Sequence, residues 1–223
     1  MLNWRVYLIM INLFIYISAI LLMFIICMQG GKATFKAPRK IKIISIIIYF
    51  LMILKFISLT LLVFVNNIRN LYWLKWIYFL DFLAIPICIL ICFYICIKNN
   101  KFNLNYIIFI IVLITSILIF FMTKYSLKIN MFNSQYYIME LLTPINMYVF
   151  FIFVNLIFLI LCLIKHNNKY INKNILYLMF FSTIVNISDI ILSFLNINIL
   201  PPNILGNIIW IYTLYTAVNK LIR

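Results

Sequence analysis

Acidic residues are almost absent from this chain, where three Asp and Glu residues stand against 18 Lys and Arg residues among 223. Glycine is equally scarce, with three in all, which excludes a glycine-rich loop able to bind phosphate groups. The sequence contains no HExxH, GxSxG or Walker motif, and no paired carboxylates at helical spacing. We therefore expect a protein without enzymatic activity.

Histidine and cysteine are also few. The only histidine, His166, lies in a lysine-rich turn, where a surface histidine is expected rather than a phosphoacceptor. All five cysteines lie in apolar stretches without CxxC spacing. Cys88, Cys92 and Cys96 share one helix face, but no His or acid accompanies them, so we interpret them as packing residues rather than metal ligands. No metal, disulfide framework or cofactor is expected.

Apolar residues are what the chain has in excess. It is 68% hydrophobic and 9% charged, with a mean hydropathy of +1.19, which is too apolar for a soluble domain of this length. Uncharged windows of about 20 residues favour membrane-spanning helices over barrel strands, whose residues would alternate in polarity. The net charge of +15 comes mostly from lysines in short loops, so it does not indicate nucleic-acid binding. The predicted fold class is an all-α polytopic membrane protein.

Seven apolar stretches are each long enough to cross a hydrocarbon core of ~30 Å at about 1.5 Å per residue. Their short connections predict a seven-helix bundle of antiparallel neighbours, forming a single domain over residues 1–223. The predicted spans are 6–28, 42–65, 72–97, 105–123, 147–165, 175–198 and 203–220.

Basic residues divide unevenly between the two sides of such a bundle. Twelve of the 18 flank one side, in the turns after the first, third and fifth spans and at the C-terminus. Five flank the other side, and Lys55 lies within a span. Since the side richer in Lys and Arg faces the cytoplasm, we predict the N-terminus outside and the C-terminus inside.

Three charged residues lie deep within spans, namely Lys55, Asp81 and Asp189. A charge at the bilayer centre costs about +2.5 to +3.5 kcal/mol on insertion scales, so such residues are usually paired or functional. Counting about 1.5 Å per residue from the predicted span ends places all three roughly 14–15 Å from the outer surface. Because Lys55 and Asp81 occupy adjacent antiparallel spans at matched depth, we predict a structural ion pair between them.

The most regular polar pattern is one helix face of span 175–198. Its members are spaced 4, 3 and 4 residues apart, and they are Ser182, Asn186, Asp189 and Ser193. Asn155, in the preceding span, lies at a comparable depth. Polar side chains avoid lipid, so this face should point into the bundle. Two interpretations stay open: the floor of a ligand pocket that opens to the outer face, or hydrogen bonds between helices that fix their packing.

Two local features bear on the same region. Segment 124–146 is the longest outer loop and surrounds Glu140 with aromatic and aliphatic residues, which predicts either an interfacial helix or a plain loop with aromatic anchors. Pro86, midway along span 72–97, predicts a kink that frees a backbone carbonyl near Asp81.

From about residue 70 onward, the chain resembles the N-terminal seven-helix sensory region of bacterial sensor histidine kinases. The resemblance rests on a few markers, which are Leu71-Tyr72-Trp73, Pro86, Thr123-Lys124-Tyr125-Ser126, the polar face around Asn186 and the turn at Pro201-Pro202. Many members differ in having a histidine after the fourth helix, a proline in the sixth, and an acid at the start of the seventh, where this chain has Asn203 or Asn207.

The resemblance implies a multi-pass protein of the bacterial plasma membrane. Most members continue from the seventh helix into a kinase, whereas this sequence ends at Arg223. The expected protein is therefore a stand-alone sensor, a fragment of a longer one, or a component that works with a separate partner.

Three functions stay open. The first is a non-enzymatic sensor or signalling module, whose expected partners are the lipid bilayer and a separate kinase or other signalling protein on the cytoplasmic side, with a homodimer left open. Its ligand-binding residues would be Asp189, Asn186, Ser182, Ser193, Asp81 and Asn155. The second is a small-solute transporter or a membrane subunit of one, against which stand the scarce glycines and the lack of broken, repeated helices. The third is an accessory structural membrane protein without a ligand.

Overall fold

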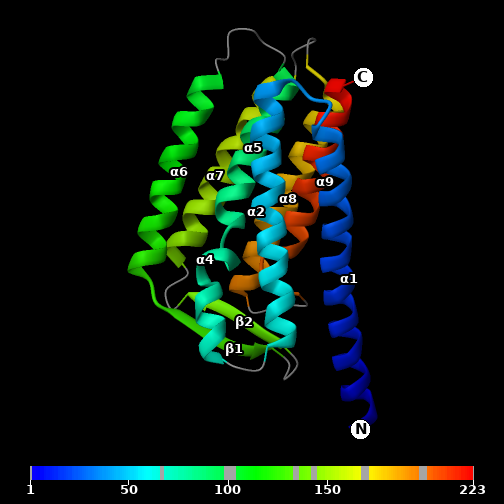
Figure 1. Cartoon of the computed structure of the whole chain (residues 1–223), viewed down its shortest axis with the longest axis vertical. Coiled ribbons are helices and arrows are strands. Elements are labelled where there is room, and N and C mark those ends of the chain that lie inside the picture. Colours follow the sequence, from blue (N-terminus) through cyan, green and yellow to red (C-terminus); the bar gives the residue numbers. More distant parts are fainter. Residues whose placement is uncertain are drawn as a thin grey trace.

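The computed structural model describes residues 2–65, 68–97, 104–132, 136–141, 145–166, 171–195 and 200–222. The chain is predominantly helical, as the sequence predicted (Figure 1). The long helices are α1 (Leu2–Thr34), α2 (Arg39–Phe64), α5 (Asp81–Ile97), α6 (Leu104–Lys124), α7 (Ile145–Lys165), α8 (Lys173–Phe194) and α9 (Ile204–Ile222). The shorter elements are α3 (Ile68–Leu71), the 3-10 helix η1 (Tyr72–Leu74), α4 (Lys75–Tyr78) and the strands β1 (Leu127–Phe132) and β2 (Tyr136–Leu141).

Within the described part of the chain, five helical segments are long and apolar enough to cross a membrane. They are Met10–Thr34, Arg39–Phe64, Ile68–Ile97, Ile145–Lys165 and Lys173–Phe194. Apolar side chains also cover the outward faces of the bundle, where Phe14 on α1 is 74% exposed and Phe109 on α6 is 69% exposed. Because lipid rather than water suits such surfaces, these segments indicate a multi-pass membrane protein.

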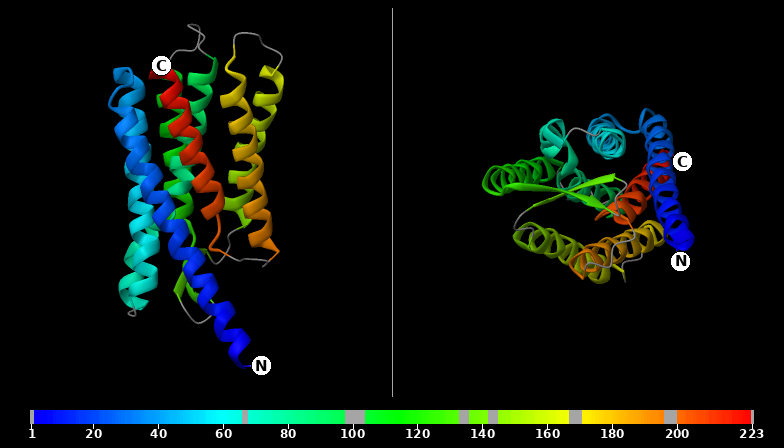
Figure 2. Two further views of the ribbon diagram at one scale, coloured as in Figure 1. Left: turned by 90° about the vertical axis from the view of Figure 1, so that its right-hand side faces the viewer. Right: turned by 90° about the horizontal axis from the view of Figure 1, so that it is seen from below.

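Helix α9 lies in the interior of the bundle, packed against α1, α5 and α8. Figure 2 shows its orange-to-red ribbon beside the blue ribbon of α1. Trp210, Leu214 and Ala217 are fully buried, and so are the polar residues Asn207 and Thr213. The neighbouring helices therefore shield the polar groups of α9 from lipid.

The third predicted span is not one continuous helix. It consists of η1 and α4, followed by a turn at Phe79–Leu80 and then by α5, and the short helix α3 lies directly before it. At this break the backbone forms hydrogen bonds of the 3-10 type, between residues three apart. The Phe82 N–H donates to the Phe79 carbonyl at 3.2 Å, and the Leu83 N–H donates to the Leu80 carbonyl at 3.1 Å. The segment is therefore interrupted before Asp81, a break that the sequence did not predict, and the kink at Pro86 stays a prediction.

Pro86 is accommodated inside α5. It lies in the second turn of this helix, so its ring has little preceding helix to disturb. The missing N–H of Pro86 still removes the intrahelical bond to the Phe82 carbonyl, as predicted from its position.

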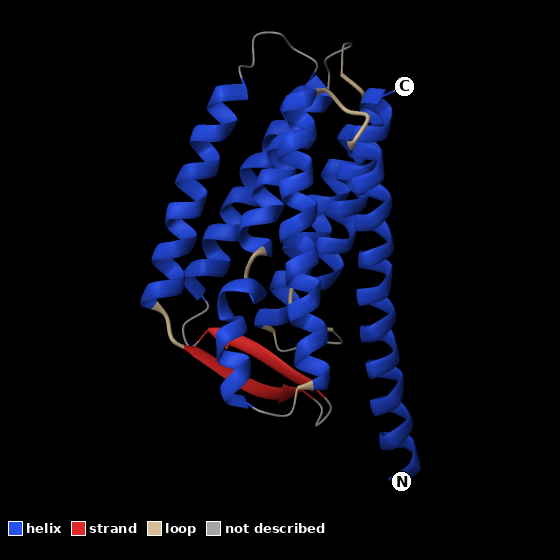
Figure 3. Ribbon diagram, in the orientation of Figure 1, coloured by secondary structure: helices blue, strands red, loops and turns tan. Residues whose placement is uncertain are grey.

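Segment 124–146 contains a β-hairpin, so the prediction of an interfacial helix or a plain loop was wrong. Strands β1 and β2 pair antiparallel from Leu127 opposite Leu141 to Phe132 opposite Tyr136. The hairpin lies across the end of the bundle that also carries the N-terminus (Figures 2 and 3). Tyr136 anchors it by stacking on the ring of Tyr16 from α1, with ring centres 4.4 Å apart.

A lysine links the interrupted segment to α6. Lys75 Nζ in α4 donates hydrogen bonds to the backbone carbonyls of Met122 at 2.6 Å and Tyr125 at 2.7 Å. These carbonyls belong to the end of α6, where intrahelical donors run out and a cation is favoured by the helix dipole.

Candidate functional site

A buried ion pair joins α2 to the first residue of α5. Lys55 Nζ contacts Asp81 Oδ2, and the side chains are 3% and 1% exposed. The pair expected from matched depth in the sequence is thus present. Asp81 is also the first residue of α5, where the positive end of the helix dipole favours a carboxylate. The break at Phe79–Leu80 is therefore what places this acid at a helix N-terminus.

Asp81 also holds the start of α9. The side-chain amides of Asn203 and Asn207 each donate to Asp81 Oδ2 at 3.4 Å. Asn203 has a φ of 67°, a backbone conformation that asparagine tolerates better than most residues. Its carbonyl accepts from the Asn207 N–H at 3.0 Å, so Asn203 is the residue that opens the helix. From the sequence, both asparagines were noted only as a departure from the family that the chain resembles, and neither was assigned to the site.

Asp189 reaches the same helix start from α8. Its Oδ2 accepts a hydrogen bond from the backbone N–H of Gly206 at 3.3 Å. The first N–H groups of a helix have no intrahelical acceptor, so this carboxylate caps α9 from a neighbouring helix. Asp189 therefore has a partner in the structure, although that partner is a backbone group rather than a cation.

Close packing of α8 on α9 depends on Gly206. A Cβ at this position would lie 2.5 Å from Asn186 Oδ1 and 3.0 Å from the Asn186 Cα. Contact with a backbone atom cannot be relieved by turning a side chain, so only glycine permits this approach. The start of α9 is thus held by Asp81 on α5 and by Asn186 and Asp189 on α8.

The remaining polar residues divide into separate contacts. Asn155 on α7 donates to the Phe151 carbonyl at 2.8 Å and accepts from Asn186 Nδ2 at 3.3 Å. Ser182 lies 2.7 Å from the hydroxyl of Thr213 on α9. Ser193 is half-buried, and no contact joins it to the other members within the described part of the chain. The structure therefore brings five of the six predicted ligand-binding residues to the α7–α8–α9 and α5–α9 interfaces and leaves Ser193 apart.

The cluster is enclosed in this structure. We call the polar cluster the group Lys55, Asp81, Asn186, Asp189, Asn203 and Asn207. Five of these residues are at most 2% exposed, and Asp189 is partly buried. Among the described residues, no cavity leads from this cluster to the end of the bundle that carries the hairpin, where the sequence predicted an opening (Figure 2).

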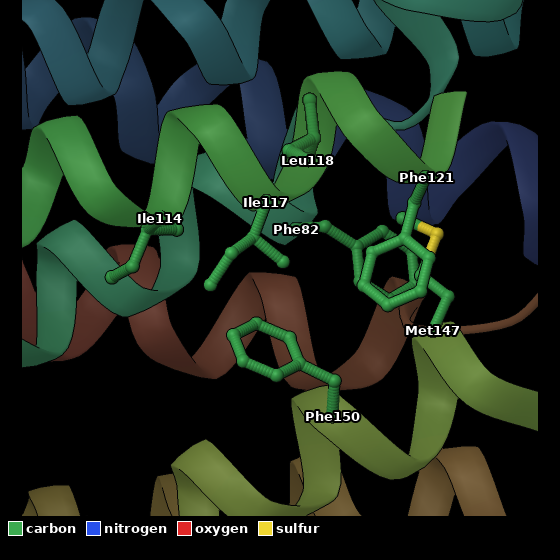
Figure 4. Close-up of a pocket in the computed structure, with 7 residues that line it drawn as sticks. All are labelled: Phe82, Ile114, Ile117, Leu118, Phe121, Met147 and Phe150. Carbon is green, nitrogen blue, oxygen red and sulfur yellow. The ribbon is translucent and has the colours of Figure 1, made fainter. Parts of the chain in front are cut away.

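Two apolar cavities lie elsewhere. One, of about 10 Å³, lies among α5, α6 and α7 and is lined by Phe82, Ile114, Ile117, Leu118, Phe121, Met147 and Phe150 (Figure 4). The other, of about 200 Å³, lies between the ends of α7 and α8 and is lined by Cys162, Leu163, His166, Leu176, Tyr177 and Phe180. The first is barely large enough for one water molecule, and its lining offers no polar side chain.

The three cysteines on one face of α5 are packing residues, as interpreted from the sequence. Cys88 donates to the Trp210 carbonyl at 3.5 Å and Cys96 to the Asn172 carbonyl at 3.6 Å. Within the described residues, no three His, Cys, Asp or Glu side chains are grouped so that they could hold a metal ion.

Comparison of the chain with protein-family models, with curated proteins and with solved structures gave no match.

Proposed function

We propose that this protein is a non-enzymatic sensor or signalling module that crosses the plasma membrane of a bacterium seven times. The spans would be α1, α2, the interrupted α3–α5 segment, α6, α7, α8 and α9. The N-terminus and the hairpin would face outward, and the C-terminus inward. The turn between α1 and α2, which carries Lys32, Lys36, Arg39, Lys40 and Lys42, lies at the same end as the C-terminus, which supports this orientation (Figure 1).

One observation carries the signalling proposal: two acids from different helices hold the same end of α9. Asp81 bonds the amides of Asn203 and Asn207, and Asp189 bonds the backbone of Gly206. A ligand or an ionisation change at either acid would alter the position of α9, whose other end leads to the cytoplasmic C-terminus. A kinase or other signalling partner that binds the C-terminal end of α9 would respond to that movement.

The proposed movement can be measured with spin labels at Lys220→Cys on α9 and Lys40→Cys on α2. Both positions are exposed near the same end of the bundle, whereas all five native cysteines are buried. We expect Asp81→Asn and Asp189→Asn each to shift the mean distance between the labels by about 2 Å, the scale of helix shifts in signalling proteins. Ser193→Ala is the matched control and should cause no shift. Unchanged distances in both Asn variants would rule out this coupling.

A transporter is the second candidate, and the break before α5 favours it. Scarce glycines and the lack of broken, repeated helices counted against transport in the sequence, whereas the structure has a helix interruption directly before the buried Lys55–Asp81 pair. Proteoliposomes containing a pH-sensitive dye distinguish the two functions under an imposed membrane potential. Proton flux above that of empty liposomes, lost in Asp81→Asn, would favour transport, whereas flux equal to that of empty liposomes would favour sensing.

A further inference from the structure

Four buried oxygen atoms in the polar cluster have no hydrogen-bond partner among the described residues. They are Asp81 Oδ1, Asn186 Oδ1, Asn203 Oδ1 and Asn207 Oδ1. A buried polar atom without a partner is costly, and most such atoms in proteins are satisfied by protein groups, water or an ion. Four of them around one helix start therefore point to something that this site binds.

The hydrogen-bond network fixes all four as acceptors. Asn203 and Asn207 must direct their NH₂ groups at Asp81, because an ionised carboxylate only accepts. Asn155 donates to a backbone carbonyl, so its own oxygen must receive the NH₂ group of Asn186. Turning any of these amides would break an existing bond, so the unpaired atoms need a donor or a cation from elsewhere.

The four oxygens belong to one contiguous region. Asn203 and Asn207 lie one turn apart at the start of α9, and both contact Asp81. Gly206, between them, packs directly against the Asn186 amide. The Phe82 carbonyl, next to Asp81, is a further acceptor that Pro86 deprives of its intrahelical donor.

Charge decides what kind of occupant fits. Lys55 neutralises Asp81 through Oδ2, whereas Asp189 bonds a backbone N–H and has no salt bridge to a cation among the described residues. With all three ionised, the cluster carries one net negative charge. A monovalent cation balances it, whereas a divalent ion would leave an excess positive charge beside Lys55. Carboxylate and amide oxygens are also the ligands that hard cations prefer.

We propose that a monovalent alkali cation of the sodium class binds between α5, α8 and α9, with oxygen ligands from Asp81, Asn186, Asn203 and Asn207. Asp189 supplies the balancing negative charge. The ion ties the start of α9 to both helices that carry the acids. This site goes beyond the proposed function, because binding requires neither signalling nor transport.

The experiment compares thermal unfolding of the full chain in lipid nanodiscs in sodium, lithium, potassium, calcium and choline chloride at equal ionic strength. A ligand that binds only the folded state raises the melting temperature in a saturable way, by roughly 5–10 °C at a hundred times its Kd. We expect such a rise with an alkali cation relative to choline. Equal melting temperatures in all salts would overturn the proposal and leave water as the partner of these oxygens, and a preference for calcium would overturn the monovalent assignment.

Two variants place the site. Asn203→Gly removes one ligand while suiting the positive φ, so this variant should fold. Asn207→Leu removes a second ligand. Each should weaken cation affinity at least tenfold, read as a shift of the sodium titration. Ser182→Ala, a buried change on α8 that removes no unpaired oxygen, is the control and should keep the wild-type titration. A sodium effect unchanged in both ligand variants would overturn the assignment. The experiment measures melting temperature and not signalling, so its outcome does not depend on the sensor proposal.

Discussion

The Lys55–Asp81 ion pair can be tested by substituting first one partner and then both. Lys55→Met keeps an unbranched side chain of similar length but leaves a carboxylate that is 1% exposed without its cation. Two amide donors at 3.4 Å then remain on Oδ2. Removing one partner of a buried pair typically costs about 3–5 kcal/mol, and we expect Lys55→Met to lose about that much unfolding free energy.

Adding Asp81→Asn should restore most of the loss. The amide at position 81 carries no charge, and its oxygen can still accept from Asn203 and Asn207. Replacement of a whole buried ion pair by neutral groups is often close to neutral, so the double variant should lie within about 1 kcal/mol of the wild type. Asp81→Asn alone would leave Lys55 buried without its carboxylate and should also cost about 3–5 kcal/mol, so the two substitutions would be coupled by at least about 5 kcal/mol in a double-mutant cycle.

The assay is reversible unfolding in mixed micelles of a mild detergent and dodecyl sulfate, followed by tryptophan fluorescence. Ser45→Ala is the matched control, because Ser45 is also buried on α2 and its hydroxyl has no partner among the described residues. That substitution should cost almost nothing. A Lys55→Met cost below about 1 kcal/mol, the value for exposed pairs, or additive effects of the two substitutions, would refute the reasoning.

Three further substitutions test the packing around the cluster. Gly206→Ala should lose about 1–3 kcal/mol in the same titration because its Cβ would collide with α8, whereas Gly31→Ala, with no atom within 4 Å of the new Cβ, should be neutral or stabilising. Tyr16→Ala should speed amide exchange in the hairpin, whose tyrosine stacks on it, and the exposed Phe14→Ala should not. Lys75→Met should weaken the last turn of α6 by about 0.3–1 kcal/mol, seen as faster exchange there. Equal effects within a matched pair, or unchanged exchange in α6, would contradict the contact concerned.

Helix positions were largely predictable, because apolar length is a strong signal when a bilayer must be crossed. The predicted spans 105–123 and 147–165 agree closely with Leu104–Lys124 and Ile145–Lys165. The Lys55–Asp81 pair was predictable for a related reason, since two charges in apolar surroundings at matched depth have few other partners.

The helix break at Phe79–Leu80 was not predictable from local sequence. The residues around it are apolar and aromatic, and neither glycine nor proline marks the turn. The break instead accompanies tertiary contacts, in which Asp81 reaches Lys55 and the start of α9. A local pattern carries no information about such distant partners.

The hairpin did leave a signal that the analysis of apolar length obscured. In β1, Leu127, Ile129 and Met131 alternate with Lys128 and Asn130, which is the period of a strand. Strand β2 begins with Tyr136, Tyr137 and Ile138, residues of types that favour strands. A short alternation of apolar and polar residues was hard to recognise in a chain where almost every segment is apolar.

The unfavourable features of this fold, namely buried charges and a positive φ at a non-glycine residue, are concentrated at the start of α9. A membrane protein could pack this helix with leucine and avoid burying charges, because a well-packed apolar replacement of a buried ion pair is usually no less stable. Instead, α9 is held by Asp81 and Asp189, and the contact requires Gly206 and a positive φ at Asn203. Contacts made of charges and long hydrogen bonds respond to protons, ions and polar ligands, whereas apolar packing does not. This arrangement therefore suits a helix whose position must change, which favours a sensing or transporting role over a purely structural one.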